Sequence, residues 1–153
     1  MHPGILGTPA PLRSDLAILL EIAIGIGLGF GALFARRGRY RLHVWCQSVL
    51  VLLNLVLIVV VMMPSFDQQV LPRIPARLGK PFVAIATAHA AMGITAECLA
   101  VYILLSAGTT WLPASLRLQR YRPWMRATLA VWWLALLFGL ATYGRWYIPS
   151  FFR

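Results

Sequence analysis

Residues 49–63 read VLVLLNLVLIVVVMM, and Asn54 is the only polar residue in this run. The apolar character extends over about residues 42–63, which is enough for a helix to cross a hydrocarbon core about 30 Å thick. In lipid, only helices and closed barrels satisfy every backbone hydrogen bond. Barrel strands alternate apolar and polar residues, and this run does not alternate. The stretch therefore predicts a membrane-spanning helix.

Three further apolar stretches of spanning length lie at about residues 15–35, 82–106 and 124–146. The first is longer than the apolar part of a signal peptide and ends in two arginines rather than at a cleavage site, so it is interpreted as a retained span. We therefore predict an all-α integral membrane four-helix bundle that forms a single domain over residues 1–153.

The segment after the second span is rich in proline. Pro64 is expected to end the second helix, because proline lacks the backbone N–H and favours turns. Further prolines follow at positions 72, 75 and 81. We expect a stiff outer loop that covers polar residues of the bundle or offers a surface to a partner.

The composition agrees with a membrane location. The chain is 60% hydrophobic and 12% charged, with a mean hydropathy of +0.76, whereas soluble domains are roughly 45–50% apolar and about 25% charged. These values exclude an ordinary soluble enzyme and a disordered chain. No hydrolase, kinase or thiol-oxidoreductase motif is present, so enzymatic activity stays open but is not favoured.

The net charge is +10, from 14 basic and 4 acidic residues. The basic residues gather at the loops after the first and third spans, with eight on that side of the membrane and six on the other. The positive-inside rule therefore predicts cytoplasmic basic loops and outer termini. The loop arginines predict contact with anionic lipid head groups or partner subunits, and nucleic-acid binding is not expected. These arginines are Arg36, Arg37, Arg39, Arg41, Arg117, Arg120 and Arg122.

Small residues predict close helix packing in the first span. Gly25 and Gly29, and Gly27 and Gly31, form two overlapping G-x-x-x-G pairs, the spacing that lets membrane helices approach closely. Glu21 lies one turn before Gly25 on the same helical face. We therefore expect its carboxyl group to point into the bundle.

Ionisable groups inside a span usually mark function, because a charge at mid-membrane costs roughly 2.5–3.5 kcal/mol. With a rise of about 1.5 Å per residue, Glu21, Asn54 and His89 fall in the outer half of the membrane. With Met62 and Met63 near that end, they form the predicted cofactor-binding cluster. A second polar group, nearer the cytoplasm, comprises Glu97, Gln47 and His43. The alternative interpretation is that the buried polar residues have no further function. In that case each is satisfied by a hydrogen bond and serves only to fix the helix register.

Several cofactors are compatible with the outer cluster. His43 and His89 differ by about 21 Å in predicted depth, which is too far for two ligands of one haem iron. A bis-histidine haem is therefore not supported. Haem b held by one histidine and a methionine, copper at His89, and a quinone head group all remain open.

Several short stretches resemble a known group of proteins. They are Arg41-Leu42-His43, Ala88-His89-Ala90-Ala91-Met92-Gly93, Arg122-Pro123-Trp124-Met125-Arg126, and Trp132-Trp133 followed by Gly139 and Tyr143. Together they resemble the small four-helix bacterial membrane proteins of uncharacterised function that include maturation factors for haem–copper cytochrome oxidase. Where that family has another histidine at the start of the fourth span, this chain has Trp124 and Arg126.

The resemblance implies a multi-pass protein of the bacterial inner membrane. It further implies association with other membrane subunits of a respiratory or photosynthetic electron-transfer complex, as an assembly factor or accessory subunit. Two alternatives stay open: a purely structural scaffold subunit without a cofactor, and a proton or small-solute carrier. The sequence shows neither the broken helices nor the repeats that are typical of transporters, which counts against the carrier alternative.

Overall fold

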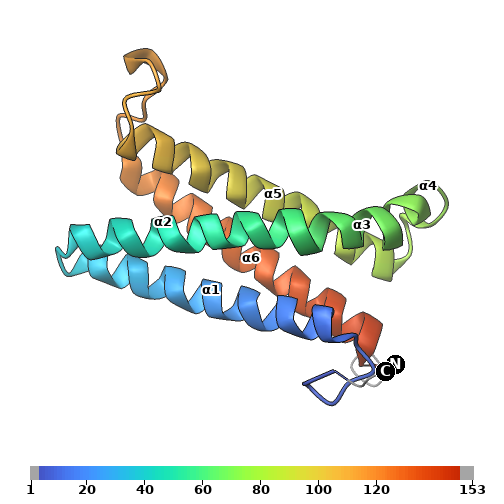
Figure 1. Ribbon diagram of the computed structural model, residues 1–153. Coiled ribbons are helices and arrows are strands. Elements are labelled where there is room, and N and C mark those ends of the chain that lie inside the picture. The colour runs from blue at the N-terminus through green and yellow to red at the C-terminus, as the bar shows by residue number, and fades with distance from the viewer. Residues whose placement is uncertain (1–3, 149–153) are drawn as a thin grey trace.

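The computed structural model describes residues 4–148, so His2 and Arg153 of the sequence lie outside the described part. Four long helices run alternately up and down (Figure 1). They are α1 (Leu12–Arg36), α2 (Tyr40–Leu57), α5 (Pro81–Gly108) and α6 (Tyr121–Tyr147). Within residues 4–148, these helices account for four segments long and apolar enough to cross a membrane. The predicted all-α, four-helix character is confirmed, and the chain is a multi-pass membrane protein.

The four helices close into a ring. α1 packs on α2 and α6, while α5 packs on α6 and α2. This is the neighbour pattern of an up-down-up-down bundle. Apolar side chains from all four helices meet at the centre, and many other large apolar side chains lie exposed on the outside, as lipid contact requires. The central side chains are Ile24, Leu28, Val51, Leu57, Ala96, Ala100 and Trp132.

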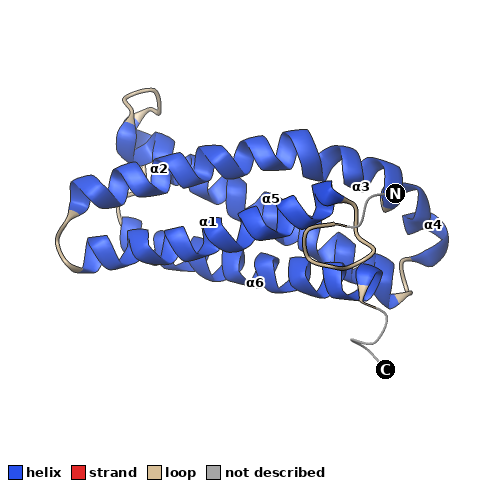
Figure 2. Cartoon of the chain, turned by 60° about the horizontal axis from the view of Figure 1, so that its bottom comes forward, coloured by secondary structure: helices blue, strands red, loops and turns tan. Residues whose placement is uncertain are grey.

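The two basic loops lie at one end of the bundle, and both ends of the described chain lie at the other (Figures 1 and 2). The loop between α5 and α6 contains the short helix η3 (Ala114–Leu116). The Leu118 amide donates to the Ser106 hydroxyl at 2.8 Å, and the Tyr121 hydroxyl donates to the Ser106 carbonyl at 2.9 Å. These bonds tie the loop to the ends of its two helices.

Three of the four glycines in the two G-x-x-x-G pairs pack closely, as expected. A methyl group on Gly27 or Gly31 would lie 2.7 Å from Leu50 or 2.6 Å from Gln47 on α2, and one on Gly25 would lie 3.1 Å from Leu136 on α6. The prediction is wrong for Gly29, whose missing side chain would meet nothing within 4 Å. Gly29 faces a gap between α1 and α6 instead of a neighbouring helix.

The prediction that Pro64 ends the second helix is wrong. Helical backbone continues from α2 through a π-helical turn, η1 (Ile58–Met62), into α3 (Met63–Gln69). Two short helices follow, η2 (Leu71–Arg73) and α4 (Ile74–Arg77), so the expected proline-rich loop is largely helical.

A side chain from α1 explains why the helix survives its proline. In an α-helix, the N–H of residue 64 would bond the Val60 carbonyl, and Pro64 has no N–H to give. Arg13 donates from Nη2 to that carbonyl at 2.6 Å and to the Val61 carbonyl at 3.3 Å. The Ser65 hydroxyl also donates to the Val61 carbonyl, at 2.7 Å. Prolines persist within membrane helices when neighbours satisfy the freed carbonyls in this way.

The segment after the π-helical turn packs against α5 and α6 near one end of the bundle. Val70 is buried against Val83 and Ala86 of α5. Phe66, Ile74, Phe82 and Trp146 pack around these three residues.

The Arg13 contact gives a testable prediction. Replacing Arg13 with methionine should lower the free energy of unfolding by about 1 kcal/mol, the scale of a hydrogen bond within a membrane protein. In a Pro64→Ala background the loss should be smaller, because the alanine N–H can bond Val60. Unfolding in mixed micelles, with exposed Arg77→Met as the control, measures both. Equal losses in the two backgrounds would contradict this account of Arg13.

Candidate functional site

A cavity of about 410 Å³ opens between the α2–α3 segment, α5 and α6. Most of its lining is apolar, and Glu21, Asn54, Asp67, Thr87 and His89 contribute polar groups. Near α3 and the middle of α5, four lining residues are exposed on the surface of the bundle: Met63, Asp67, Ala91 and Ile94. The cavity therefore reaches from the interior to the lipid-facing side. All five residues of the predicted outer cluster line the cavity. Asn54, Met62 and Met63 come from the α2–α3 segment, Glu21 from α1 and His89 from α5.

Glu21 and His89 form the polar centre of this cavity. The His89 Nε2 atom lies 3.5 Å from a Glu21 carboxylate oxygen, and both side chains are largely buried. The Nδ1–H of His89 donates to the Ala135 carbonyl at 2.9 Å. That bond fixes the ring so that Nε2 faces Glu21. At 3.5 Å the two groups are at the outer limit of a direct hydrogen bond, so each keeps capacity for another partner.

Gly139 of α6 makes room for this pair. A methyl group at position 139 would lie 2.9 Å from both the Glu21 Oε2 atom and the His89 Cε1 atom. No real Cβ atom tolerates such contacts without movement of the neighbours. Three helices thus build the pair: α1 supplies the acid, α5 supplies the base, and α6 supplies the space and the Ala135 carbonyl.

Asn54 points toward a different acid than the depth estimate indicated. Its Nδ2 donates to Glu97 Oε2 at 2.9 Å, in a buried contact between α2 and α5. Glu97 Oε1 is buried and has no hydrogen-bond partner among the described residues. Glu97 therefore bonds a residue of the predicted outer cluster, and Gln47, which the predicted depths group with it, bonds the Leu28 carbonyl instead. The predicted depth of Asn54 assumes a second helix that ends at residue 63. The observed helix continues past that residue, so Asn54 lies level with Glu97.

His43 and Gln47 of the second helix bind the backbone of α1. The Nδ1–H of His43 donates to the Gly31 carbonyl at 2.8 Å, and Gln47 Nε2 donates to the Leu28 carbonyl at 3.2 Å. Neither residue lines the cavity. Both contacts hold the two helices at the close spacing that Gly27 and Gly31 permit. His43 and His89 lie in opposite halves of the bundle.

Asp15 is a buried acid that the sequence did not single out, because it sits at the edge of an apolar run. It is fully buried. Its carboxylate accepts hydrogen bonds from the Leu6 amide at 2.9 Å and the Tyr143 hydroxyl at 2.5 Å. Thr8 lies 2.7 Å from the same tyrosine hydroxyl. Asp15 therefore fixes the segment before α1 against α6 and is satisfied without a ligand.

Comparison with protein-family models, curated proteins and solved structures finds no match to this chain. Within residues 4–148, no three His, Cys, Asp or Glu side chains form a group that would hold a metal ion. The geometry of the cavity is therefore the basis for assigning a role.

Adding one methyl group at position 139 tests whether the Glu21–His89 pair needs the space that Gly139 provides. Gly139→Ala should lower the free energy of unfolding by about 1–3 kcal/mol, the usual effect of overpacking. It should also move the NMR signals of the His89 ring, one of three histidines in the chain. Gly93→Ala, where a methyl group meets nothing within 4 Å, is the control and should do neither. An unshifted His89 signal in Gly139→Ala would contradict this role of Gly139.

The Asn54–Glu97 contact predicts strong coupling between two substitutions. Asn54→Leu leaves the buried Glu97 carboxyl without its partner and should destabilise the protein by about 1–3 kcal/mol. Adding Glu97→Met removes the stranded group, so the double variant should recover much of that loss. A double-mutant cycle of unfolding free energies provides the measurement. Additive effects would show that the contact contributes no coupling.

Proposed function

We propose that this protein binds a quinone or quinol from the bilayer in the cavity around Glu21 and His89. The observation that carries the proposal is the juxtaposition of this acid–base pair with an apolar cavity that reaches the lipid-facing side. Ligand pockets typically have volumes of about 300–1,000 Å³, with mostly apolar walls and a few convergent polar groups. The cavity, at about 410 Å³, fits this description.

The pair offers the two contacts that a quinone head group uses. A quinone carbonyl accepts a hydrogen bond, and His89 Nε2 provides the donor when protonated, because Nδ1 is already bound to Ala135. A quinol hydroxyl donates a hydrogen bond, and the Glu21 carboxylate accepts it. Trp132, which is buried and lines the cavity, offers an aromatic face to the ring. The isoprenoid tail would leave between Met63 and Ile94 toward lipid.

The wider role that we propose is that of an accessory subunit or assembly factor of a respiratory or photosynthetic electron-transfer complex. Its support is the resemblance carried by the stretches around His43, His89 and Trp132. The proposed location is the bacterial inner membrane. The proposed orientation has the end with both basic loops in the cytoplasm and the cavity in the outer half, and the positive-inside rule supports it.

Quinone binding can be measured directly on purified protein in nanodiscs. A radiolabelled decyl-chain quinone should bind saturably, near one molecule per chain. His89→Phe should weaken binding by about tenfold, the scale of one hydrogen bond of about 1.4 kcal/mol. Gly93→Leu should abolish binding, because Gly93 lines the cavity and has open space where the side chain would go. Gly29→Leu, which fills a different gap, should bind as the wild type does.

Two results would overturn the quinone assignment. One is the absence of saturable binding, or binding that Gly93→Leu leaves intact. The other is a Soret band in the purified protein that disappears in His89→Ala, since that would establish a haem at the same residue. Co-purification in mild detergent with subunits of an electron-transfer complex tests the wider role. Recovery of the chain without such subunits would contradict it and favour a separate function.

A further inference from the structure

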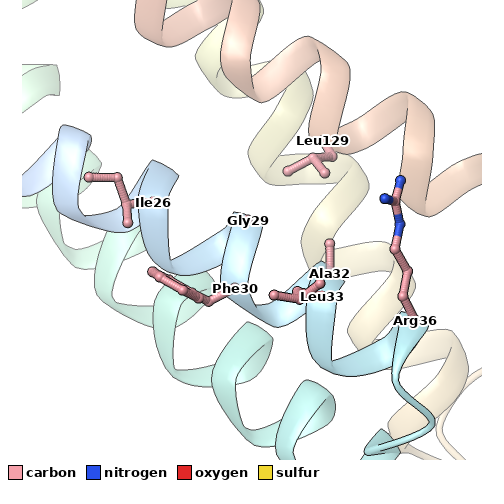
Figure 3. Close-up of a pocket in the computed structure, with 7 residues that line it drawn as sticks. All are labelled: Ile26, Gly29, Phe30, Ala32, Leu33, Arg36 and Leu129. Atoms are coloured by element: carbon pink, nitrogen blue, oxygen red, sulfur yellow. The ribbon is translucent and has the colours of Figure 1, made fainter.

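A second hollow lies on the outside of the bundle, at the end that carries the basic loops. It is a groove of about 410 Å³ between α1 and α6. Figure 3 shows Phe30 and Leu33 along one face of α1 and Leu129 on the facing helix α6, with Arg36 at the end of the row. The groove is separate from the cavity around His89, with which it shares no lining residue.

We propose that this groove binds one anionic phospholipid, with an acyl chain along α1 and the head group at Arg36. The lining residues Ile26, Phe30 and Leu33 recur at helical spacing and form an apolar wall. Gly29 provides the floor, because its missing side chain leaves open space. Ile26 and Phe30 are exposed, at 50% and 57% of their surface, so the groove opens outward to lipid.

The length of the groove matches one leaflet. Ten residues separate Ile26 from Arg36, which corresponds to about 15 Å of helix at a rise of 1.5 Å per residue. That is half of a hydrocarbon core about 30 Å thick. An acyl chain of a single leaflet would therefore fill the groove and place its phosphate at the level of Arg36.

The charge at this end selects an anionic head group. Arg36 makes no hydrogen bond or ion pair with any of the residues 4–148, so its guanidinium group is available. Arg126 precedes Leu129 by three residues, so the two share a face of α6, and α6 begins at this end of the bundle (Figure 1). Arg37, Arg39 and Arg41 follow in the adjacent loop and at the start of α2, and no acidic residue of the described part of the chain lies at this end. Basic residues attract the anionic lipids of a leaflet, and the apolar groove adds a defined position.

The experiment compares two lipids with identical acyl chains. Wild-type protein in micelles is given phosphatidylglycerol or phosphatidylcholine, and retained lipid is counted by native mass spectrometry. We expect one tightly held phosphatidylglycerol and weaker retention of phosphatidylcholine. Arg36→Gln should reduce the preference by about fivefold, the effect of one basic residue near an anionic surface. Gly29→Leu should remove the tightly held lipid by filling the groove.

The control is Gly93→Leu, which introduces the same side chain into open space elsewhere in the bundle. It should retain phosphatidylglycerol as the wild type does. Circular dichroism confirms that all variants are folded before lipids are counted. Equal retention of both lipids by the wild type, or unchanged phosphatidylglycerol retention in Gly29→Leu, would overturn the proposal. Because quinone binding depends on Gly93 and lipid binding on Gly29, either proposal can fail without the other.

Discussion

Inside a bilayer, no water is present to bind polar groups, so partners within the protein stabilise them, and this constraint organises the bundle. The Val60 carbonyl, freed by Pro64, is bound by Arg13. The Asp15 carboxylate is bound by a backbone amide and Tyr143. The Arg13–Val60 and Asp15–Tyr143 contacts each join helices that are distant in sequence, whereas the Leu6 amide ties the segment before α1 to α1 itself. The polar side chains therefore fix which helices are neighbours, while the apolar ones fill the space between them.

The same constraint explains which parts of the fold the sequence predicts. A span is a local property, because twenty apolar residues specify a membrane helix whatever surrounds them. The continuation past Pro64 is not local. It depends on Arg13, whose contact with Val60 joins residues 47 positions apart. Nothing in the sequence near Pro64 indicates that its freed carbonyl will be bound, so the expected helix end is the natural local prediction.

The candidate site was predictable to a similar degree. The predicted depths put Glu21 and His89 at one level, and in the structure the two side chains lie 3.5 Å apart beside Gly139. The depth prediction fails for Asn54, whose level depends on where the second helix ends. Asp15 escapes notice because its environment is made by Leu6 and Tyr143, from opposite ends of the chain. The depth predicted from a residue's position in its span therefore identifies polar residues inside the membrane more reliably than it identifies their partners.

The glycines of the long helices differ in what a side chain at each position would meet. A glycine within a helix costs about 1 kcal/mol relative to alanine. At Gly27, Gly31 and Gly139 that cost has a visible structural purpose, because a methyl group would collide with a neighbouring side chain. At Gly29 and Gly93 a methyl group would collide with nothing. Packing among residues 4–148 does not explain these two glycines, and they border the groove at Arg36 and the cavity around His89. Their absent side chains keep those hollows open, which is the property expected of positions that face a bound molecule rather than another helix.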